Sequence, residues 1–312
     1  MRWEVSTQAP ATVANLGPGF DVLGLVLGGP GDIVQARRAP GTGVRLVEIT
    51  GDGGRLPRAA ADNTAGVAAL ETLKVAGVET GVELALHKRL PLCSGLGSSA
   101  SSAAAAAYAV NLLIGSPLRK AELVAPCVEA EAAVSGRHAD NVAPALLGGL
   151  VLVRGIDPVE LLRLPVPPGL TLVVVTPEFE LPTREARAVL PAEVTLQTMV
   201  KQSARLASLV SALHTADMAL LGRCLVDEVV TPRRAALVPG APEAMAAALG
   251  AGALGSSLSG SGPSVFALCR SPRSAEVAAT AMGRAFETAG LASQLRMSPA
   301  DGPGVRRVRG VS

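Results

Sequence analysis

The chain has few aromatic residues and little lysine. Only 2% of its 312 residues are Phe, Trp or Tyr, and lysine occurs only at positions 74, 88, 120 and 201. So few rings offer no platform on which the bases of single-stranded nucleic acid could stack. The formal net charge is only +2, and the basic run at 306–309 is typical of a solvated end. We therefore expect no nucleic-acid partner and a core built from Ala, Val and Leu.

Paired cysteines and long apolar runs are also missing. The cysteines are scattered and form no Cys-x-x-Cys pair: Cys93, Cys127, Cys224 and Cys269. This pattern predicts reduced thiols. The longest apolar runs, such as 103–114, are shorter than the roughly 20 residues of a membrane span, and Met1–Val5 carries no signal-peptide core. We therefore expect a cytoplasmic protein with no membrane partner.

A turn rich in glycine and serine is the most informative stretch: Pro91-Leu92-Cys93-Ser94-Gly95-Leu96-Gly97-Ser98-Ser99. It follows an alternating apolar run at 82–87, which predicts a strand, and leads into an alanine-rich run at 101–113, which predicts a helix. Free N–H groups and the helix dipole favour an anion at such a helix N-terminus. The turn therefore predicts a phosphate site, and residues 91–99 are called the phosphate turn below. A turn of this composition can also simply cap a buried helix.

Two known nucleotide motifs fit this turn poorly. A Walker A loop needs a lysine after its second conserved glycine, and none is present. The dinucleotide fingerprint matches Gly95, Gly97 and Ala100. However, Pro91 and Ser94 interrupt the strand that should run directly into the first glycine. A Rossmann domain therefore stays only a minor alternative.

A loop near the N-terminus places an amide and a carboxylate close together. Gly17-Pro18-Gly19 forces the chain into a loop, and Asn15 and Asp21 flank it. These residues either satisfy the backbone of their own turn or hold polar groups at a substrate. The pattern alone leaves both interpretations open.

Three polar residues stand near predicted helix ends. Asn63 has the position of an N-cap for a helix over 64–76, so we expect a cap first and a ligand contact second. Glu131 lies near the end of a helix predicted over 118–134, where a carboxylate opposes the helix dipole and a bound cation would relieve that cost. His138 follows in a polar turn, and because no His or Cys cluster surrounds it we expect no zinc site.

Length and composition predict two domains. A chain of 312 residues is too long for one ordinary core, and the proline-rich stretch 158–169 predicts a hinge. We therefore divide the chain into domains 1–157 and 158–312. The second domain begins with a buried strand at 170–176, and a long amphipathic helix is predicted over 196–225.

The second domain also carries candidate binding residues. Thr183 has the position of a helix N-cap, and a second Gly/Ser-rich loop at 255–264 leads into a strand. Arg187, Arg233 and Arg234 are either surface charges or guanidinium forks that hold a carboxylate. One phosphoryl-transfer site would explain both Gly/Ser loops, the Asn/Asp loop and these arginines together, whereas a structural explanation needs a separate coincidence for each.

Five segments carry a family resemblance: PATVANLGPGFD at 10–21, LPLCSGLGSSA at 90–100, HADNVAP at 138–144, TREAR at 183–187 and SGSGPSVF at 259–266. With them the chain resembles the GHMP superfamily of small-molecule kinases, and most closely its homoserine kinase family. The resemblance implies a two-domain α+β fold, with an N-terminal domain like ribosomal protein S5 domain 2 and a ferredoxin-like C-terminal domain.

The resemblance also implies an activity. This is transfer of the γ-phosphoryl group of ATP, with magnesium, to the side-chain hydroxyl of L-homoserine, as a step of threonine biosynthesis. Phosphoryl transfer depends mainly on positioning and charge stabilisation, so the missing catalytic lysine is no objection. For the oligomeric state we expect a homodimer.

The resemblance further assigns residues by position. ATP would contact Asn63 at its adenine and, along its phosphates, Pro91, Leu92, Cys93, Ser94, Gly95, Leu96, Gly97, Ser98 and Ser99. Magnesium would be held by Ser99 and Glu131. Homoserine would contact Asn15, Asp21, His138, Thr183, Arg187, Arg234, Ser259, Gly260, Ser261 and Gly262. The candidate catalytic residues are Asp21, to orient or deprotonate the acceptor hydroxyl, and Asn15.

Two other interpretations stay open. Another GHMP kinase would share the phosphate turn and prefer a different acceptor. A non-catalytic relative would keep the fold and bind a ligand without turnover, although the intact set of Ser99, Glu131 and Asp21 argues against it.

Overall fold

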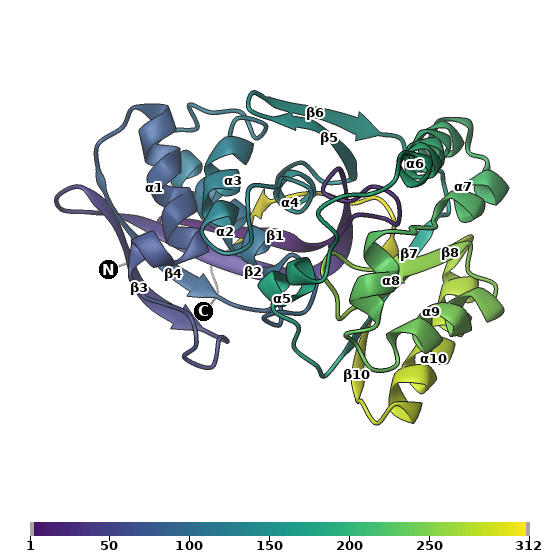
Figure 1. The fold of residues 1–312 in the computed structure, drawn as a ribbon. Coiled ribbons are helices and arrows are strands. Elements are labelled where there is room, and N and C mark those ends of the chain that lie inside the picture. The colour runs from purple at the N-terminus through teal and green to yellow at the C-terminus, as the bar shows by residue number, and fades with distance from the viewer. Residues whose placement is uncertain (1–2, 310–312) are drawn as a thin grey trace.

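The computed structural model describes residues 3–309, which form two β-sheets with helices packed against them (Figure 1). The first sheet has the strand order β11-β1-β2-β4-β3, with β5 joined to β2 and β6 joined to β5. Its strands are β1 (Val5–Ala14), β2 (Leu23–Ala39), β3 (Gly43–Thr50), β4 (Gly81–His87), β5 (Leu150–Ile156), β6 (Val159–Leu164) and β11 (Arg306–Arg307). Strands β3 and β4 run parallel, while β1 and β2 form a long antiparallel pair.

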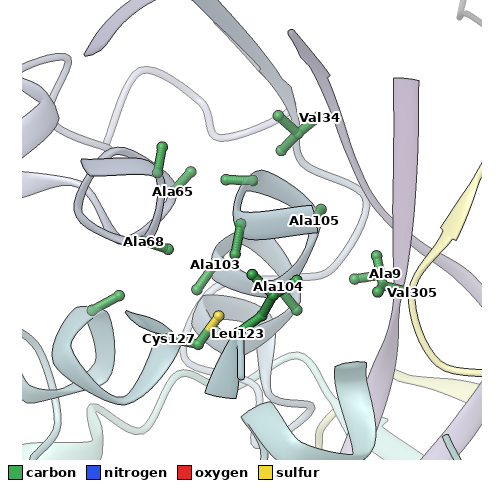
Figure 2. Packing of buried hydrophobic residues seen from close by; sticks show 14 of the residues in the cluster. Ala9, Val34, Ala65, Ala68, Ala103, Ala104, Ala105, Leu123, Cys127 and Val305 are labelled. Atoms are coloured by element: carbon green, nitrogen blue, oxygen red, sulfur yellow. The ribbon is translucent and has the colours of Figure 1, made fainter. Parts of the chain in front are cut away.

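Helices cover one face of this sheet (Figure 1). They are α1 (Thr64–Ala76), α2 (Ser98–Leu113), α3 (Val124–Ala132) and α4 (Val142–Leu147), with a single 3-10 turn, η1 (Ala60–Asp62), before α1. Helix α2 lies at the centre, against α1, α3, β1 and β2. Its run Ala103–Ala107 is fully buried, because alanine favours a helix and lets neighbouring elements approach closely. Figure 2 shows this packing, which fixes the N-terminus of α2 relative to the sheet.

The second sheet is antiparallel, in the order β10-β7-β9-β8. Its strands are β7 (Thr171–Pro177), β8 (Gly255–Leu258), β9 (Val265–Cys269) and β10 (Ser293–Pro299). The helices of this half are α5 (Thr183–Ala188), α6 (Leu196–Thr215), α7 (Met218–Cys224), α8 (Val230–Ala235), α9 (Ala241–Gly250) and α10 (Pro272–Thr288). Helices α9 and α10 pack against this sheet.

Strand β7 separates two apolar clusters because successive side chains of a strand point to opposite faces. Val173 and Val175 belong to the cluster under α9 and α10. Leu172 and Val174 belong to a second cluster, which also contains residues of α6, α7 and, from β2, Leu23. This second cluster therefore joins the two sheets, and burial of its apolar surface holds the two halves of the chain together.

The local predictions around the phosphate turn are confirmed. The strand expected at 82–87 is β4, and the alanine-rich helix is α2, which begins already at Ser98. Helix α1 has the expected bounds, with the Asn63 side chain accepting from the N–H of Ala65 at 3.0 Å. These elements depend on cap and propensity signals within a few residues, which the sequence shows directly.

Several other predicted elements have different bounds. The helix expected from 118 begins only at Val124. The helix expected over 196–225 is two helices, because Ala216 is left-handed (φ 53°) and the Asp217 side chain caps α7. The expected cap at Thr183 is wrong, since Pro182 holds the N-cap position and Thr183 is the first residue of α5.

The proline-rich stretch expected as a hinge contains strand β6, which pairs with β5 in the first sheet. Strand β11 also returns to that sheet from the end of the described chain. The first sheet thus takes strands from both sides of residue 158, and the division into domains 1–157 and 158–312 stays a prediction. All four cysteines are free thiols. Among residues 3–309, none of the helices combines the length and apolarity that a membrane span requires.

Candidate active site

A cavity of about 410 Å³ lies between the two halves of the chain, a volume typical of small-molecule sites. Most residues that the sequence predicts for the site line it: Asn15, Asp21, Asn63, Leu92, Cys93, Ser94, Gly95, Gly97, Ser98, Ser99, Glu131, His138, Thr183, Arg187, Arg234, Gly260 and Ser261. Pro91, Leu96, Ser259 and Gly262 are not among the lining residues. The fold thus brings together side chains that the sequence spreads over more than two hundred residues.

The phosphate turn ends at an uncapped helix N-terminus. Gly97 is the N-cap residue of α2, in a left-handed conformation (φ 62°), and no side chain caps the helix there. The first N–H groups of a buried 16-residue helix therefore face the cavity with the positive end of its dipole. Gly95 (φ 74°) must be glycine, because a Cβ would lie 2.5 Å from the carbonyl oxygen of Ser259.

The second Gly/Ser loop holds the phosphate turn in place. The Ser259 hydroxyl donates to the carbonyl oxygen of Gly95, and the Ser264 hydroxyl donates to that of Ser94, each at 2.6 Å. Both serines are fully buried. Ser259 therefore acts on the turn rather than from the wall of the cavity, and Leu96 is likewise buried in the cluster between the sheets.

Ser99 and Glu131 fit the predicted magnesium site. Glu131 is 2% exposed; its Oε2 accepts from the Ser135 hydroxyl at 2.9 Å, whereas its buried Oε1 has no partner among the described residues. Burial raises the pKa of this carboxyl, and His138 and the nearby Ser99 and Ser135 hydroxyls lower it only in part. A cation beside Oε1 would satisfy this oxygen and remove the cost of its buried charge.

Within residues 3–309, no group of three His, Cys, Asp or Glu side chains could hold a metal ion by itself. Magnesium commonly uses only one or two protein carboxylates and takes its other ligands from water and substrate phosphates. The chemistry of Ser99 and Glu131 therefore suits an ion that arrives with a nucleotide.

The Asn/Asp loop has a strained backbone. Asn15 (φ 73°), Leu16 (φ 47°) and Asp21 (φ 56°) are all left-handed without being glycine. Asn15 stabilises the loop, because its Oδ1 accepts from the N–H of Asp21 at 3.1 Å and its Nδ2 donates to the carbonyl oxygen of Gly260 at 2.9 Å. Strain held by such contacts is typical of functional sites, and here it turns the Asp21 carboxylate toward the cavity.

Asp21 forms an ion pair with Arg187. Arg187 Nη2 donates to both carboxylate oxygens, at 2.9 and 3.1 Å. Burial raises the pKa of Asp21 and the neighbouring Asp140 raises it further, while Arg187 and His138 lower it in part. Two segments about 170 residues apart thus meet through a pair that faces the cavity.

Arg234 is, like Arg187, an arginine of the cavity wall. It is 2% exposed, its Nε donates to the carbonyl oxygen of Ala186 and its Nη1 to that of Gly260, both at 3.0 Å. Burial, and then the charge of Arg187, lower its pKa to about 10. The Phe20 ring lies 5.2 and 5.5 Å from the guanidinium carbons of Arg234 and Arg187, so an aromatic face helps to stabilise both cations.

His138 connects Asp140 with Ser135, which is itself a hydrogen-bond partner of Glu131. Its Nδ1 lies 3.1 Å from Asp140 Oδ1, and its Nε2 lies 3.0 Å from the Ser135 hydroxyl. Burial lowers the pKa of His138, but its hydrogen bond to Asp140 and the charge of that carboxylate outweigh burial and raise it. Thr183 and Ser261, from the two other predicted segments, approach within 3.4 Å through their hydroxyls.

The sequence assigns no role to several polar residues of the cavity wall, among them Lys88, Asp140 and Asn141. Lys88 follows the strand that leads into the phosphate turn, and only this position in the sequence could have indicated a role in the site. Asp140 and Asn141 lie within the segment 138–144 that carried the resemblance. Asn141 Oδ1 accepts from the Thr12 hydroxyl at 2.7 Å, a contact across 129 residues that no local pattern predicts.

Two family models match the chain. The GHMP kinases N terminal domain matches residues 63–149, and the GHMP kinases C terminal model matches residues 209–288. The uncapped helix N-terminus in the cavity lies within the first of these matches. The fold and the site therefore define a GHMP kinase, the class of enzymes that use ATP to phosphorylate a hydroxyl, and the α+β fold expected from the resemblance is confirmed.

Comparison with individual proteins narrows this class. The chain is 44% identical to the homoserine kinase of Chlorobium phaeovibrioides over 311 residues, covering 96% of this chain and 97% of that one. It is 46% identical to the homoserine kinase of Arabidopsis thaliana over 316 residues, covering 99% and 85%. The crystal structure of homoserine kinase from Cytophaga hutchinsonii matches with a TM-score of 0.95 at 43% identity, covering 99% and 98%. The chain belongs to the homoserine kinase family.

Proposed function

We propose that this protein transfers the γ-phosphoryl group of ATP to the side-chain hydroxyl of L-homoserine, giving O-phospho-L-homoserine for threonine biosynthesis. The observation that carries the proposal is that one cavity receives both the uncapped N-terminus of α2 and the Asp21–Arg187 pair. The first suits phosphates. The second suits the opposite charges of a free amino acid.

On the nucleotide side, the turn 91–99 would bind the phosphates through its backbone N–H groups and through the hydroxyls of Ser98 and Ser99. Asn63 would lie near the adenine, although its side chain is engaged at both ends, with Ala65 and with the carbonyl oxygen of Pro57. Magnesium, held by Ser99 and Glu131, would neutralise charge on the β- and γ-phosphates.

On the acceptor side, Arg187 and Arg234 would hold the α-carboxylate of homoserine. In the structure, Arg187 is paired with Asp21. A substrate carboxylate that takes over Arg187 would release Asp21 toward the amino alcohol. Asn15, His138, Thr183, Ser261 and the Gly260 backbone would complete this subsite.

Asp21 is our candidate to orient or deprotonate the acceptor hydroxyl. Its raised pKa brings it closer to the range that suits a general base. Asn15 would keep this carboxylate in position through its bond to the Asp21 N–H. Most of the rate enhancement would come from alignment of hydroxyl and phosphate and from charge stabilisation.

An acceptor screen tests the proposal. ADP release would be followed with homoserine, mevalonate, shikimate and galactose at equal concentrations. We expect turnover with homoserine to exceed the others by far, because only an amino acid satisfies both arginines and Asp21. Absent turnover with homoserine, or equal turnover with all four compounds, contradicts the proposal; binding without any turnover would indicate a non-catalytic relative.

A matched pair of glutamates tests the metal site. Glu131→Gln removes the charge beside Ser99. We expect kcat to fall by about a hundredfold or more, and half-maximal activity to require a higher magnesium concentration. Glu129→Gln is the control, because Glu129 is two residues away, partly exposed (39% of its side chain), and paired with Arg137. Magnesium dependence of ADP binding, measured by calorimetry, separates a metal effect from a loss of fold. An unchanged magnesium dependence in Glu131→Gln would rule out this ligand.

The expectations for the whole molecule also remain proposals. We place the protein in the cytoplasm, which suits four free thiols, and we propose a homodimer. Light scattering at several protein concentrations tests the second expectation, since a monomer at all of them would contradict it.

A further inference from the structure

The side chains of Lys88 and Asp32 form a buried ion pair beneath the phosphate turn. They are 2% and 0% exposed, respectively. Besides the Asp32 carboxylate, three oxygens lie within hydrogen-bond distance of Lys88 Nζ: the carbonyl oxygen of Ser98 at 2.9 Å, the Ser98 hydroxyl at 2.7 Å and the Ser102 hydroxyl at 2.9 Å. The three N–H groups of the ammonium are therefore shared among four acceptors. One ammonium group thus holds the first turn of α2 through three of its oxygens.

Asp32 is fixed by other donors. Its Oδ1 accepts from the N–H groups of Arg89 and Leu90 at 2.9 and 3.1 Å, and its Oδ2 accepts from the Ser102 hydroxyl at 2.7 Å. Asp32 lies on β2, so these contacts join the sheet to the start of the phosphate turn. Removal of the Lys88 ammonium from this position would leave several buried polar groups without a hydrogen-bond partner, and each of them would lower the stability of the fold.

The pair is oriented with its cation toward the cavity. Lys88, Ser98 and Ser102 line the cavity, and Asp32 does not. The positive end of the pair and the positive end of the α2 dipole therefore face the same space. A lysine that served only to neutralise Asp32 would have no need to lie between that carboxylate and the cavity.

We infer that Lys88 is a nucleotide-positioning residue, which holds the first turn of α2 against the phosphates and supplies the positive charge that the turn itself lacks. This inference rests on the proposed function of the turn as the phosphate site of ATP. It assigns Lys88 an effect on phosphate affinity that is separate from its effect on stability. Affinity for the acceptor should not depend on it.

The test separates these effects with a double variant. Lys88→Met alone leaves a buried carboxylate unpaired and should lose both stability and nucleotide affinity. Lys88→Met combined with Asp32→Asn removes both charges, and we expect it to recover most of the stability. Its affinity for ADP, measured by calorimetry with and without magnesium, should still be at least about tenfold below wild type. Its homoserine KM should stay within about twofold.

Lys120→Met is the matched control. Lys120 is partly buried and, like Lys88, donates to a backbone carbonyl oxygen, that of Val305, but it does not line the cavity. We expect this variant to bind ADP as wild type does. Tight ADP binding by the double variant, equal to that of wild type, overturns the inference.

A milder variant covers the case in which the double variant does not fold. Ser102→Ala keeps both charges but removes one acceptor of the Lys88 ammonium and one donor to Asp32. We expect ADP affinity to fall by about threefold or more, with a smaller loss of stability than in Lys88→Met. Unchanged ADP affinity in Ser102→Ala would contradict the inference. If wild type itself binds no nucleotide, the proposed function fails instead, so the two failures are distinguishable.

Discussion

Two ion pairs of the cavity differ in how firmly the fold fixes them. The side chains of Lys88 and Asp32 are almost fully buried, and both charged groups have several further partners. The side chains of Arg187 and Asp21 are 32% and 34% exposed and meet at the cavity wall. Arg187 Nε is buried without a hydrogen-bond partner among residues 3–309. The first pair is locked, whereas the second still has an unused donor.

The difference follows the chemistry expected of each side. Charges that stabilise a transferring phosphoryl group act best when they are in place beforehand and do not reorganise. An amino-acid site must instead exchange its internal contacts for the charges of the incoming molecule, and a pair that is one-third exposed is held less firmly than a buried one. This contrast suits the proposed nucleotide side, whose charges would stay in place, and the proposed acceptor side, whose contacts would be exchanged for those of the substrate.

The same substitution at the two aspartates tests this contrast most strongly. Asp32→Asn leaves the Lys88 charge buried and unpaired, which should lower the free energy of unfolding by about 3–5 kcal/mol. Asp21→Asn should change it by no more than about 1 kcal/mol, since that pair is solvent-screened and asparagine tolerates a left-handed backbone. Denaturant unfolding measures both values, and ADP release measures the activity that Asp21→Asn should lose. Equal losses of stability would erase the distinction between the two sides.

A pair of glycines with nearly the same backbone tests the rigidity of the nucleotide side. Gly95 and Gly54 have φ of 74° and 75°, but a Cβ at Gly95 would meet the carbonyl oxygens of Ser259 and Gly262 at 2.5 and 2.7 Å, whereas nothing lies within 4 Å at Gly54. We expect Gly54→Ala to cost about 1 kcal/mol of stability for the backbone alone, and Gly95→Ala to cost about 2–3 kcal/mol and much of the nucleotide affinity. Thermal unfolding and ADP calorimetry check both. Similar losses in the two variants would show that the turn yields to the added methyl group.

A pair of neighbouring arginines tests the acceptor side. Arg234→Leu should raise the homoserine KM by about ten- to a hundredfold while leaving the ATP KM nearly unchanged, because a carboxylate contact belongs to the acceptor alone. Arg233→Leu is the control, since Arg233 is exposed and its Nη1 donates to the carbonyl oxygen of Val229. Steady-state kinetics with each substrate varied in turn gives the comparison. A parallel rise of both KM values in Arg234→Leu would point to its bonds with Ala186 and Gly260 instead.

The sequence predicted the parts of the site whose signals are local. A strand, a glycine turn and an alanine-rich helix mark the proposed phosphate site within some thirty residues, and Asn63 is recognisable as a cap from its neighbours alone. The Asn/Asp loop was also found, because glycine and proline mark it. The structure confirms one of its two open interpretations, because Asn15 satisfies its own turn. Asp21 lines the cavity, and its contact with a substrate stays a prediction.

The parts that could not be predicted depend on contacts between distant segments. Ser259 holds Gly95 across 164 residues, so its burial and its bond are visible only once the halves are joined. Lys88 was counted as one of few lysines, yet only the pairing of β2 with β4 brings it to Asp32. Propensity and periodicity report on neighbours in sequence, and both of these contacts lie outside their range.

The smallest effect is expected at an exposed ion pair, that of Arg55 with Glu180, of which only Arg55 lines the cavity. Arg55, from the loop after β3, donates to Glu180, from the segment before α5, with Nη2 and Oε2 2.7 Å apart. Both side chains are about half exposed, so solvent and salt screen their attraction.

We expect Arg55→Ala to change the ATP KM by less than about twofold at physiological salt, and Glu180→Ala to do the same. A double-variant cycle at low and high salt measures any coupling, which should be weak and should vanish as salt is added. A large, salt-resistant effect of Arg55 on nucleotide affinity would mean that the nucleotide side also depends on an exposed pair that can open. In that case exposure would not distinguish fixed charges from exchangeable ones, and the contrast between Lys88–Asp32 and Arg187–Asp21 would need another cause.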